Sequence, residues 1–394
     1  MFKEKLQQKF SWCDPDTVSG LPTVNYSAID KIERISNVPY EYFFSNYLRA
    51  NVPCIITSSV TKNWKSRLEW VSKNGQPNFV FLEQEFGSTV VPVSDCNIRE
   101  YNTQHSSNML FKDYLSYWQA LNETTKEHSP CLYLKDWHFQ RIFPNYEAYN
   151  TPEYFQSDWL NEFCETQKDD YKFVYMGPKG TWTPLHADVY GSYSWSANIC
   201  GKKRWLLFPP GQEELLKDEK NQLLYSLDAD DLQKCKVTYF DIIQEAGEII
   251  FVPSGWYHQV WNMENTISIN HNWLNACNIV YIWHCLHKSA LEVEKEMSDC
   301  KSADNWEDLC QVVLKELQGL NYDEFLKFLA YIFEVRSKCL NYFSKENYSW
   351  AVLYDIKSIQ STCSKIINCK PSENVLCAVN SLQDNITDFL LKIE

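Results

Sequence analysis

Long apolar runs are missing from this sequence. No uninterrupted apolar segment approaches the roughly 18 residues that a membrane-spanning helix needs. The first residues, MFKEKLQQKFSWCD, carry charged and amide side chains where a secretory signal needs an apolar core. We therefore expect a soluble protein that does not associate with membranes and works in the cytoplasm, with presence in the nucleus left open.

Positive charge is also in short supply. The chain has 37 Lys and Arg against 51 Asp and Glu, a net charge of −14. A broad nucleic-acid-binding face needs clustered cations to neutralise phosphates, so this balance argues against direct nucleic-acid binding and leaves only a local basic patch open. An acidic protein is better matched to a partner of basic character.

Close cysteine spacings are absent as well. The 15 cysteines are odd in number, and none falls in a Cys-x-x-Cys pair or another zinc-cluster spacing. We expect reduced, mostly buried thiols. The sequence also has no internal repeat and no low-complexity tract, while 44% hydrophobic and 15% aromatic residues are enough for a large core in one or two domains.

Three kinds of pattern divide the chain. Residues 1–129 mix helical and extended patterns: PYEYFFSNYLRANVPCIIT predicts a helix and then a short strand, NFVFLEQEFGSTVVPVSD predicts two short strands or a strand and a turn, and MLFKDYLSYWQAL predicts a packing helix. Residues 130–277 are short β-rich runs separated by Gly, Pro and Asn turns, which is typical of a jelly-roll sandwich or barrel. Residues 278–394 have helical periodicity.

The helical region contains an apolar stripe in YDEFLKFLAYIF. Phe325, Phe328, Leu329 and Phe333 lie near one face of the predicted helix. The simplest interpretation is that this stripe belongs to the core. Pairing of two chains into a homodimer through the helical region is the alternative that the sequence leaves open.

The string His186-Ala187-Asp188, within TWTPLHADVYGS, is the first sign of a metal site. On a strand, alternate side chains share a face, so His186 and Asp188 would point the same way. A neutral imidazole and a carboxylate suit Fe(II), Mn(II) or Zn(II), and a second histidine would complete a triad that leaves three coordination positions open. A lone His-x-Asp is more often structural, so the interpretation depends on the third ligand.

His258 is the best candidate for that ligand. It lies on the second arm of EIIFVPSGWYHQVWN, which predicts a strand, a Pro-Ser-Gly turn and another strand. His271 and His138 compete with it. His271 sits between Asn270 and Asn272 late in the following strand, and we interpret it as a wall residue.

Lys203 is a second candidate site residue. In WSANICGKKRWLLFPP, Gly201-Lys202 predicts a tight turn, and Lys203 opens the strand that follows. A lysine buried among Trp195, Trp205 and strand residues would need an anion. The alternative is a solvated turn made by Lys202, Lys203 and Arg204, which composition alone cannot exclude.

Together these motifs resemble the jumonji-C family of 2-oxoglutarate and Fe(II)-dependent oxygenases. The resemblance is strongest over residues 171–273 and rests on three segments: TPLHAD, WSANICGKKRWLLFPP and AGEIIFVPSGWYHQVWNMENTISINHNW. It implies a mainly β fold, with a double-stranded β-helix of the jelly-roll, cupin-like kind as its core, N-terminal α/β elements and a helical C-terminal region. It also implies Fe(II), 2-oxoglutarate and O2 as the cofactors and co-substrates.

The resemblance assigns roles residue by residue. His186, Asp188 and His258 match the iron ligands of the family. Lys203 matches the lysine that pairs with the distal carboxylate of 2-oxoglutarate, and Thr183 matches a hydroxyl that hydrogen-bonds the same carboxylate. Tyr133 is a further candidate for that carboxylate.

Two positions depart from the commoner pattern of the family. Related hydroxylases often carry Asn seven residues before the lysine, where this chain has Ser196, with Asn198 two residues on. Asn270 stands where some relatives carry Thr. These departures leave the iron site as it is, but they leave open which groups hold the C1 end of the keto acid.

The activity implied is oxidative. Taken whole, the chain is most similar to members of the family that hydroxylate a lysine side chain of a translation release factor. The alternative within the family is an N-methyl-lysine demethylase, and Asp188 favours a hydroxylase because histone demethylases of the family frequently carry Glu there. A zinc hydrolase would have no use for Lys203 or Thr183. The intact ligand set argues against a catalytically silent interaction protein.

Overall fold

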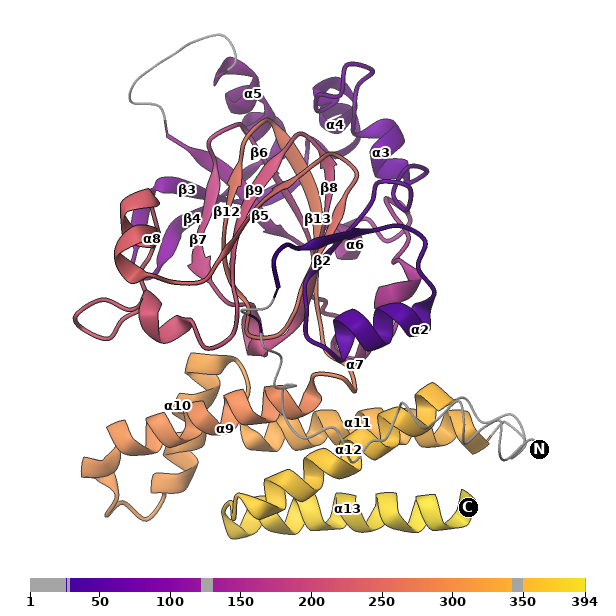
Figure 1. The fold of residues 1–394 in the computed structure, drawn as a ribbon, viewed down its shortest axis with the longest axis vertical. Helices are drawn as coiled ribbons and strands as arrows, with labels where there is room; N and C mark the ends of the chain where they lie inside the picture. The colour runs from indigo at the N-terminus through magenta and orange to yellow at the C-terminus, as the bar shows by residue number, and fades with distance from the viewer. Residues whose placement is uncertain (1–25, 27–28, 122–129, 342–349, 394) are drawn as a thin grey trace.

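Two β-sheets face each other and form a barrel that rests on a layer of helices (Figure 1). The computed structural model describes residues 26, 29–121, 130–341 and 350–393. The larger sheet has nine strands in the order β1-β2-β11-β8-β13-β6-β5-β3-β4, and the smaller has four in the order β10-β9-β12-β7. The chain crosses between the sheets at nearly every turn from β6 to β13, which is the jelly-roll pattern that the sequence predicts.

The strands of the barrel coincide with the β-rich runs of the sequence. They are β5 (Leu132–Trp137), β6 (Lys172–Gly177), β7 (Trp182–His186), β8 (Tyr193–Cys200), β9 (Lys203–Phe208), β10 (Phe240–Gln244), β11 (Ile249–Val252), β12 (Tyr257–Asn262) and β13 (Thr266–Trp273). The predicted mainly β, cupin-like fold is therefore confirmed.

Gly201 makes the tight passage from β8 to β9 that the sequence predicts. Its φ of +74° is a left-handed value that glycine adopts without strain. An added Cβ would stand 2.2 Å from the carbonyl oxygen of Asn265, so backbone contact also excludes a side chain. This turn carries the chain from the larger sheet to the smaller one and places Lys203 at the start of β9.

The N-terminal elements extend the same nine-stranded sheet. They are β1 (Glu33–Ile35), α2 (Tyr40–Phe43), η3 (Phe44–Leu48), β2 (Cys54–Ile56), α3 (Lys65–Glu69), α4 (Phe79–Phe86), β3 (Val90–Glu100), β4 (Thr103–Leu110) and α5 (Phe111–Leu121). The helix-then-strand prediction for PYEYFFSNYLRANVPCIIT is confirmed, as is the packing helix at α5. Because β1 to β5 pair within this sheet, the N-terminal part and the barrel share one architecture.

One prediction in this region is wrong. The segment NFVFLEQEF forms α4 instead of a strand, and only the residues that follow form β3. The side chain of Asn78 accepts a hydrogen bond from the backbone amide of Phe81 and caps the helix. Leu82 and Phe86, four residues apart, are the positions that this helix buries. A short apolar run does not separate the two states by pattern, and here capping and packing favour the helix.

Short helices interrupt the barrel segment where the sequence suggests only strands and turns. Between β5 and β6 lie α6 (Phe139–Ile142), η4 (Glu153–Phe155) and α7 (Trp159–Glu165), and η5 (Val189–Gly191) follows β7. Between β9 and β10 lie η6 (Glu213–Leu216) and α8 (Ala229–Cys235). Aspartate side chains cap the longer two: Asp158 caps α7, and Asp228 forms a capping box with Asp231 at α8.

The C-terminal helices form the layer beneath the barrel in Figure 1. They are α9 (Ile279–Glu296), η7 (Ser298–Cys300), α10 (Trp306–Gln318), α11 (Tyr322–Asn341), α12 (Trp350–Asn368) and α13 (Glu373–Ile393). Phe325, Phe328 and Leu329 are buried, and Phe333 packs against Phe389, so the stripe belongs to the core of this layer. Within the described ranges, every helix is too short or too polar to cross a lipid bilayer.

Candidate metal centre and co-substrate pocket

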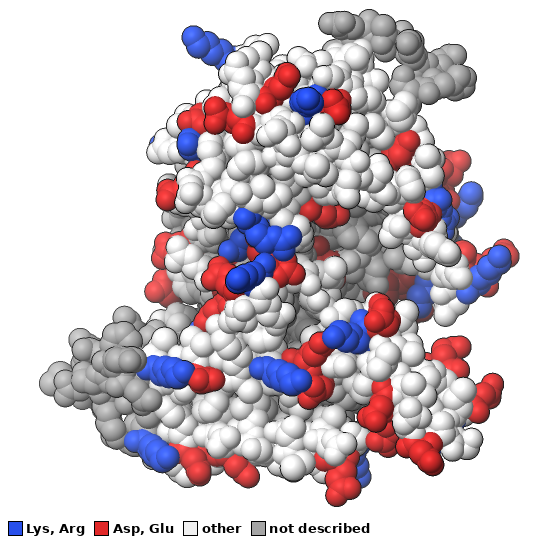
Figure 2. Space-filling model, turned by 180° about the vertical axis from the view of Figure 1, so that it is seen from behind, with Lys and Arg blue, Asp and Glu red and all other residues white. Residues whose placement is uncertain are grey.

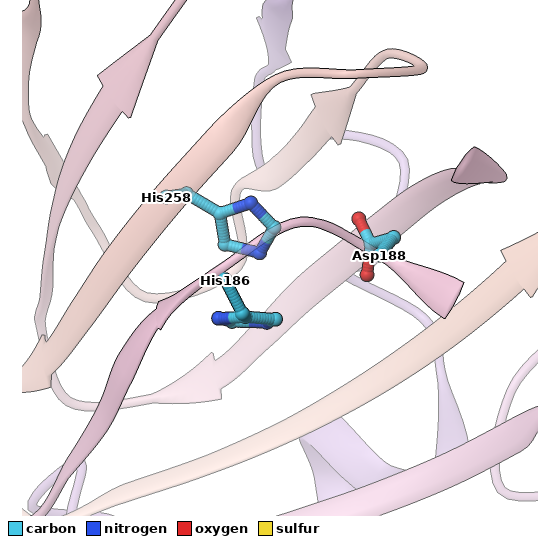
Figure 3. Close-up of side chains that lie close together, drawn as sticks. All are labelled: His186, Asp188 and His258. Carbon is cyan, nitrogen blue, oxygen red and sulfur yellow. The ribbon is translucent and has the colours of Figure 1, made fainter. Parts of the chain in front are cut away.

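His186, Asp188 and His258 come together inside the barrel (Figure 3). His186 ends β7, and His258 stands directly opposite it on β12, with ring centroids 4.2 Å apart. One possible ligand atom of each residue lies within 4.8 Å of those of the other two. Two imidazoles and a carboxylate in one cluster are the donor set of a metal with open coordination positions.

Backbone carbonyls fix the orientation of both imidazoles. The Nδ1 of His186 lies 2.8 Å from the carbonyl oxygen of Pro184, and the Nδ1 of His258 lies 3.1 Å from that of Trp256. A carbonyl only accepts, so each Nδ1 carries the proton and leaves Nε2 free to bind a metal. Burial and the neighbouring His258 lower the pKa of His186 to about 4, which keeps its imidazole neutral.

The carboxylate of Asp188 is held from two strands of the larger sheet. The hydroxyl of Ser194 on β8 donates to Oδ2 at 2.7 Å, and the amide of Asn272 on β13 donates to Oδ1 at 2.8 Å. Asp188 does not lie on the strand with His186, because β7 ends at His186 and Asp188 precedes the single turn η5. Strand alternation is therefore an incomplete reason for their proximity, although the backbone of Asp188 is still extended.

Lys203 lines the same cavity as the three metal-ligand candidates. It is 2% exposed, and its Nζ donates to the hydroxyl of Ser268 at 2.8 Å and to that of Tyr133 at 3.3 Å. No carboxylate of the described residues forms an ion pair with it. Desolvation by burial lowers its pKa to about 7. The predicted buried lysine is present, and the solvated turn is wrong for Lys203, since only Lys202 and Arg204 reach the surface.

The other predicted co-substrate residues divide into two groups. Thr183, Tyr133, Ser196 and Asn270 line the same cavity as Lys203 and the three metal-ligand candidates. Asn198 does not line it: its amide donates at 2.7 Å to the carbonyl of Gly201 and so supports the turn between β8 and β9.

The cavity has the groups that an iron–keto acid complex needs. Among the described residues, the buried amine of Lys203 has only neutral partners, and a bound anion would supply the missing opposite charge. Ser196 Oγ and Asn270 Oδ1 are buried polar atoms without a hydrogen-bond partner, and both line the cavity. The three metal-ligand candidates line the same cavity, so metal and anion sites are adjacent.

The two competing histidines have other partners. Nε2 of His271 lies 2.5 Å from the hydroxyl of Tyr149, and its ring lies 4.1 Å from that of Trp195, which agrees with its interpretation as a wall residue. His138 lies 2.6 Å from Asp170 and forms with Asp169 and Asp170 a second cluster near the surface. Arg141 pairs with Asp169 there, so that carboxylate already has a cation.

Comparison with known proteins decides the family. A model of the cupin-like domain matches residues 40–279. The 2-oxoglutarate and iron-dependent oxygenase JMJD4 of Gallus gallus is 47% identical over 333 residues, which are 82% of this chain and 78% of the chicken protein. The chain belongs to the cupin-like jumonji-C family of 2-oxoglutarate and iron-dependent oxygenases.

Other members of the family are similar over a comparable length. The JMJD4 homolog of Drosophila melanogaster is 37% identical over 402 residues, covering 93% of each chain. A protein of Arabidopsis thaliana named arginine-specific demethylase JMJ20 is 43% identical over 327 residues, covering 77% of this chain and 70% of the plant protein. Relatives of this chain are therefore named for more than one activity, and similarity to them does not identify a single reaction.

Three residues of the site were missed by sequence reasoning. Ser194 and Asn272 hold the carboxylate of Asp188, and Ser268 holds the amine of Lys203. Each is a polar residue whose two neighbours in its strand are apolar or aromatic. That pattern was a signal for a polar interior, but it did not say which side chain each residue would meet.

Proposed function

We propose that this protein is a 2-oxoglutarate, Fe(II) and O2-dependent hydroxylase that adds a hydroxyl group to a lysine side chain of a protein substrate. A translation termination factor is the substrate class that the overall resemblance favours. The observation that carries the proposal is the triad of His186, Asp188 and His258 in one pocket with the buried amine of Lys203, which has no anionic partner among the residues that the structure describes. The family assignment supports the cofactor set.

Different residues of the site would bind the metal and the 2-oxoglutarate. His186, Asp188 and His258 would hold the metal from one side and leave the other side open for ligands. Lys203, with Tyr133 and Thr183 nearby, would pair with the distal carboxylate of 2-oxoglutarate and fix its position. When bound, iron and 2-oxoglutarate supply the oxidising chemistry that converts a C–H bond into C–OH with O2. The buried side chains of Trp195 and Trp205 line the same cavity and would shield bound groups from bulk water.

Demethylation is the second candidate activity. It is favoured by the similarity to a plant protein named as an arginine-specific demethylase. Hydroxylation and demethylation both begin with oxidation of a C–H bond. In demethylation the oxidised carbon is a methyl group bonded to nitrogen, and the C–N bond then breaks and releases formaldehyde. The aspartate ligand, Asp188, is our reason for placing hydroxylation first.

The surface charge supports a basic protein partner. On the face in Figure 2, Lys and Arg side chains lie singly or in small groups beside Asp and Glu. Exposed ion pairs such as Lys172–Glu165 and Arg141–Asp169 likewise set basic and acidic side chains against each other. With a net charge of −14, such a surface attracts a basic protein better than a nucleic acid. The cytoplasm, where translation takes place, is the location that fits this substrate. A homodimer through the helical layer stays a proposal that light scattering would test.

The deciding experiment uses the substrate pool of the cell. Protein loaded with Fe(II) without oxygen is mixed with 2-oxoglutarate and a cell lysate, O2 is admitted, and modified peptides are mapped by mass spectrometry. A lysine that gains one oxygen atom supports hydroxylation, whereas loss of a methyl group with release of formaldehyde supports demethylation. The variant His258→Ala, treated identically, is the control. New modifications that also appear with this variant would contradict the proposal.

A further inference from the structure

Cys96, on β3, faces Cys131, the residue that directly precedes the neighbouring strand β5. Asp95 of β3 pairs with Leu132 of β5 in antiparallel register, which places Cys96 directly opposite Cys131. The backbone amide of Cys96 donates to the carbonyl of Cys131 at 2.8 Å and holds the two residues together. Both are free thiols. Directly opposite residues have Cβ atoms about 4.5–5.5 Å apart, close to the separation of about 3.5–4.5 Å that a disulfide requires.

The two sulfur atoms also touch the segment that leads into the site. Cys96 Sγ lies 3.5 Å from the carbonyl oxygen of Trp182, and Cys131 Sγ lies 3.8 Å from that of Gly180. Both are hydrogen-bond distances from a thiol to a carbonyl. Trp182 is the first residue of β7, the strand that carries Thr183 and ends at His186. The thiol pair therefore supports the start of the strand that contributes to both the co-substrate pocket and the metal-ligand set.

The surroundings favour reaction at Cys96. The neighbouring side chain of Cys131 lowers the pKa of Cys96, and the nearby ammonium group of Lys135 lowers it further. The Nζ of Lys135 is held by the side chain of Gln104 at 2.8 Å, and the amide of Gln104 in turn donates to the carbonyl of Trp182. Cys131 is partly exposed, so a small oxidant reaches the pair from the surface. One activated thiol beside a second thiol is the arrangement of a disulfide-forming pair.

We propose that Cys96 and Cys131 are a reversible modification site, at which hydrogen peroxide converts the two thiols into a disulfide. The sulfur of Cys96 attacks one oxygen of the peroxide, the O–O bond breaks, and a sulfenic acid and one water result. The sulfur of Cys131 then attacks the sulfenic sulfur, the S–O bond breaks, and a second water leaves. Two thiols and one peroxide give one disulfide and two waters, and a dithiol reductant reverses the change.

The disulfide acts on the start of β7. It removes the S–H groups that lie at hydrogen-bond distance from the carbonyls of Trp182 and Gly180, and it draws β3 towards the start of β5. Thr183 follows Trp182 directly, so its side chain shifts with the strand. If the proposed co-substrate site is right, the affinity for 2-oxoglutarate falls about threefold to tenfold, the size of one lost hydrogen bond.

Peptide mapping tests the modification independently of catalysis. Reduced full-length protein is treated with hydrogen peroxide, alkylated and digested without a reductant. We expect one linked species that joins the peptides of Cys96 and Cys131, and dithiothreitol should remove it. Cys96→Ser and Cys131→Ser should abolish this species, while Cys235→Ser, a partly exposed cysteine on α8, should leave it unchanged. If the peptides of Cys96 and Cys131 stay unlinked at peroxide doses that oxidise Cys235, the proposal is wrong.

A second measurement tests the effect on the pocket. Binding of 2-oxoglutarate to the Mn(II)-loaded protein is measured by calorimetry before and after peroxide treatment. The affinity of the unsubstituted protein should fall and recover with dithiothreitol, and that of Cys131→Ser should not change. A linked peptide with unchanged affinity would overturn the coupling to β7. Failure of the reduced protein to bind 2-oxoglutarate at all would instead overturn the proposed function and leave the disulfide result standing.

Discussion

At the scale of single residues, Lys203 affects both the stability of the protein and the binding of an anion in the pocket. Its amine is buried and, within the part of the chain that the structure describes, hydrogen-bonds only to hydroxyl groups; burial lowers its pKa to about 7. A buried charge without an opposite charge is unfavourable, because the energy of solvation by water is lost and little replaces it. The residue therefore opposes folding in the ligand-free protein and favours binding of an anion.

Replacing Lys203 separates these two effects. We expect Lys203→Met to raise the free energy of unfolding of the ligand-free protein by about 1–4 kcal/mol, because a chain of similar volume removes the desolvated amine. The same variant should weaken 2-oxoglutarate binding by about 2–5 kcal/mol, because the carboxylate loses its cation. Denaturant unfolding and calorimetry measure the two quantities. Lys202→Met, whose side chain is 45% exposed, is the control and should change neither by much. If both variants bind 2-oxoglutarate with the same affinity, Lys203 does not contact the bound 2-oxoglutarate.

The lowered pKa of Lys203 also predicts a pH dependence. With a pKa of about 7 in the free protein, Lys203 is mostly neutral at pH 8 and mostly charged at pH 6. A bound carboxylate favours the charged form and raises the pKa again. Binding of 2-oxoglutarate should therefore take up almost one proton at pH 8 and far less at pH 6, and its affinity should fall as the pH rises above 7. Calorimetry in buffers of different ionisation enthalpy gives the number of protons, and a pH-independent value near zero would contradict the lowered pKa.

The partners of Asp188 make a separate prediction at this scale. Without the hydroxyl of Ser194, the carboxylate loses one of the two hydrogen bonds that orient it. Loss of such an outer partner commonly lowers metal affinity about 10- to 100-fold. We expect Ser194→Ala to weaken binding of Mn(II) within this range while the midpoint of thermal unfolding changes little. Ser106→Ala, on exposed β4, is the matched control. Undiminished affinity in Ser194→Ala would mean that Asn272 alone orients Asp188.

At the scale of elements, the helical layer is joined to the barrel through an ion network. Arg336 of α11 donates two hydrogen bonds to Glu162 of α7, at 2.7 and 2.8 Å, and one to Asp355 of α12, at 2.7 Å. Trp159 of α7 also donates to Asp355. Burial raises the pKa of Asp355 to about 6 although Arg336 opposes the shift. Three helices from two regions of the sequence therefore share one guanidinium group.

Removing that guanidinium group should loosen the layer. Arg336→Met leaves Asp355 buried without its cation, and breaking a buried pair in this way costs about 3–5 kcal/mol. We expect the free energy of unfolding at pH 7.5 to fall by this amount, and to fall less at pH 5, where Asp355 is mostly protonated. Lys327→Met is the control on the same helix, because Lys327 is exposed and pairs with Asp323, which is also exposed. A loss no larger than that of the control would show that packing alone joins the layers.

At the scale of the whole molecule, the charge of the chain bears on its partner. The excess of acidic over basic residues gives a net charge of −14. Long-range attraction to a basic protein is screened beyond about 10 Å at 0.1 M salt. We expect the association rate of the substrate protein to fall steeply between low and high salt while the dissociation rate changes little. Surface plasmon resonance across a salt series measures both rates, and a salt-independent association rate would argue against a basic partner.

The sequence by itself determined the β-rich barrel, the helical end and the local motifs around His186, Lys203 and His258. These features are local, because alternation, helical periodicity and tight turns act between residues close in the chain. The prediction of a strand at Phe79–Phe86 was wrong, because a short apolar run becomes a helix or a strand according to what it packs against.

Only the tertiary structure decided how distant polar residues meet. The jelly roll places β12 beside β7, so that His258 stands opposite His186, and it brings Ser194 and Asn272 to Asp188 and Ser268 to Lys203. It also turned Asn198 towards Gly201 and set Cys96 against Cys131. Strand order and register choose these partners, because they depend on how the sheets pair as a whole and no short stretch of sequence encodes them.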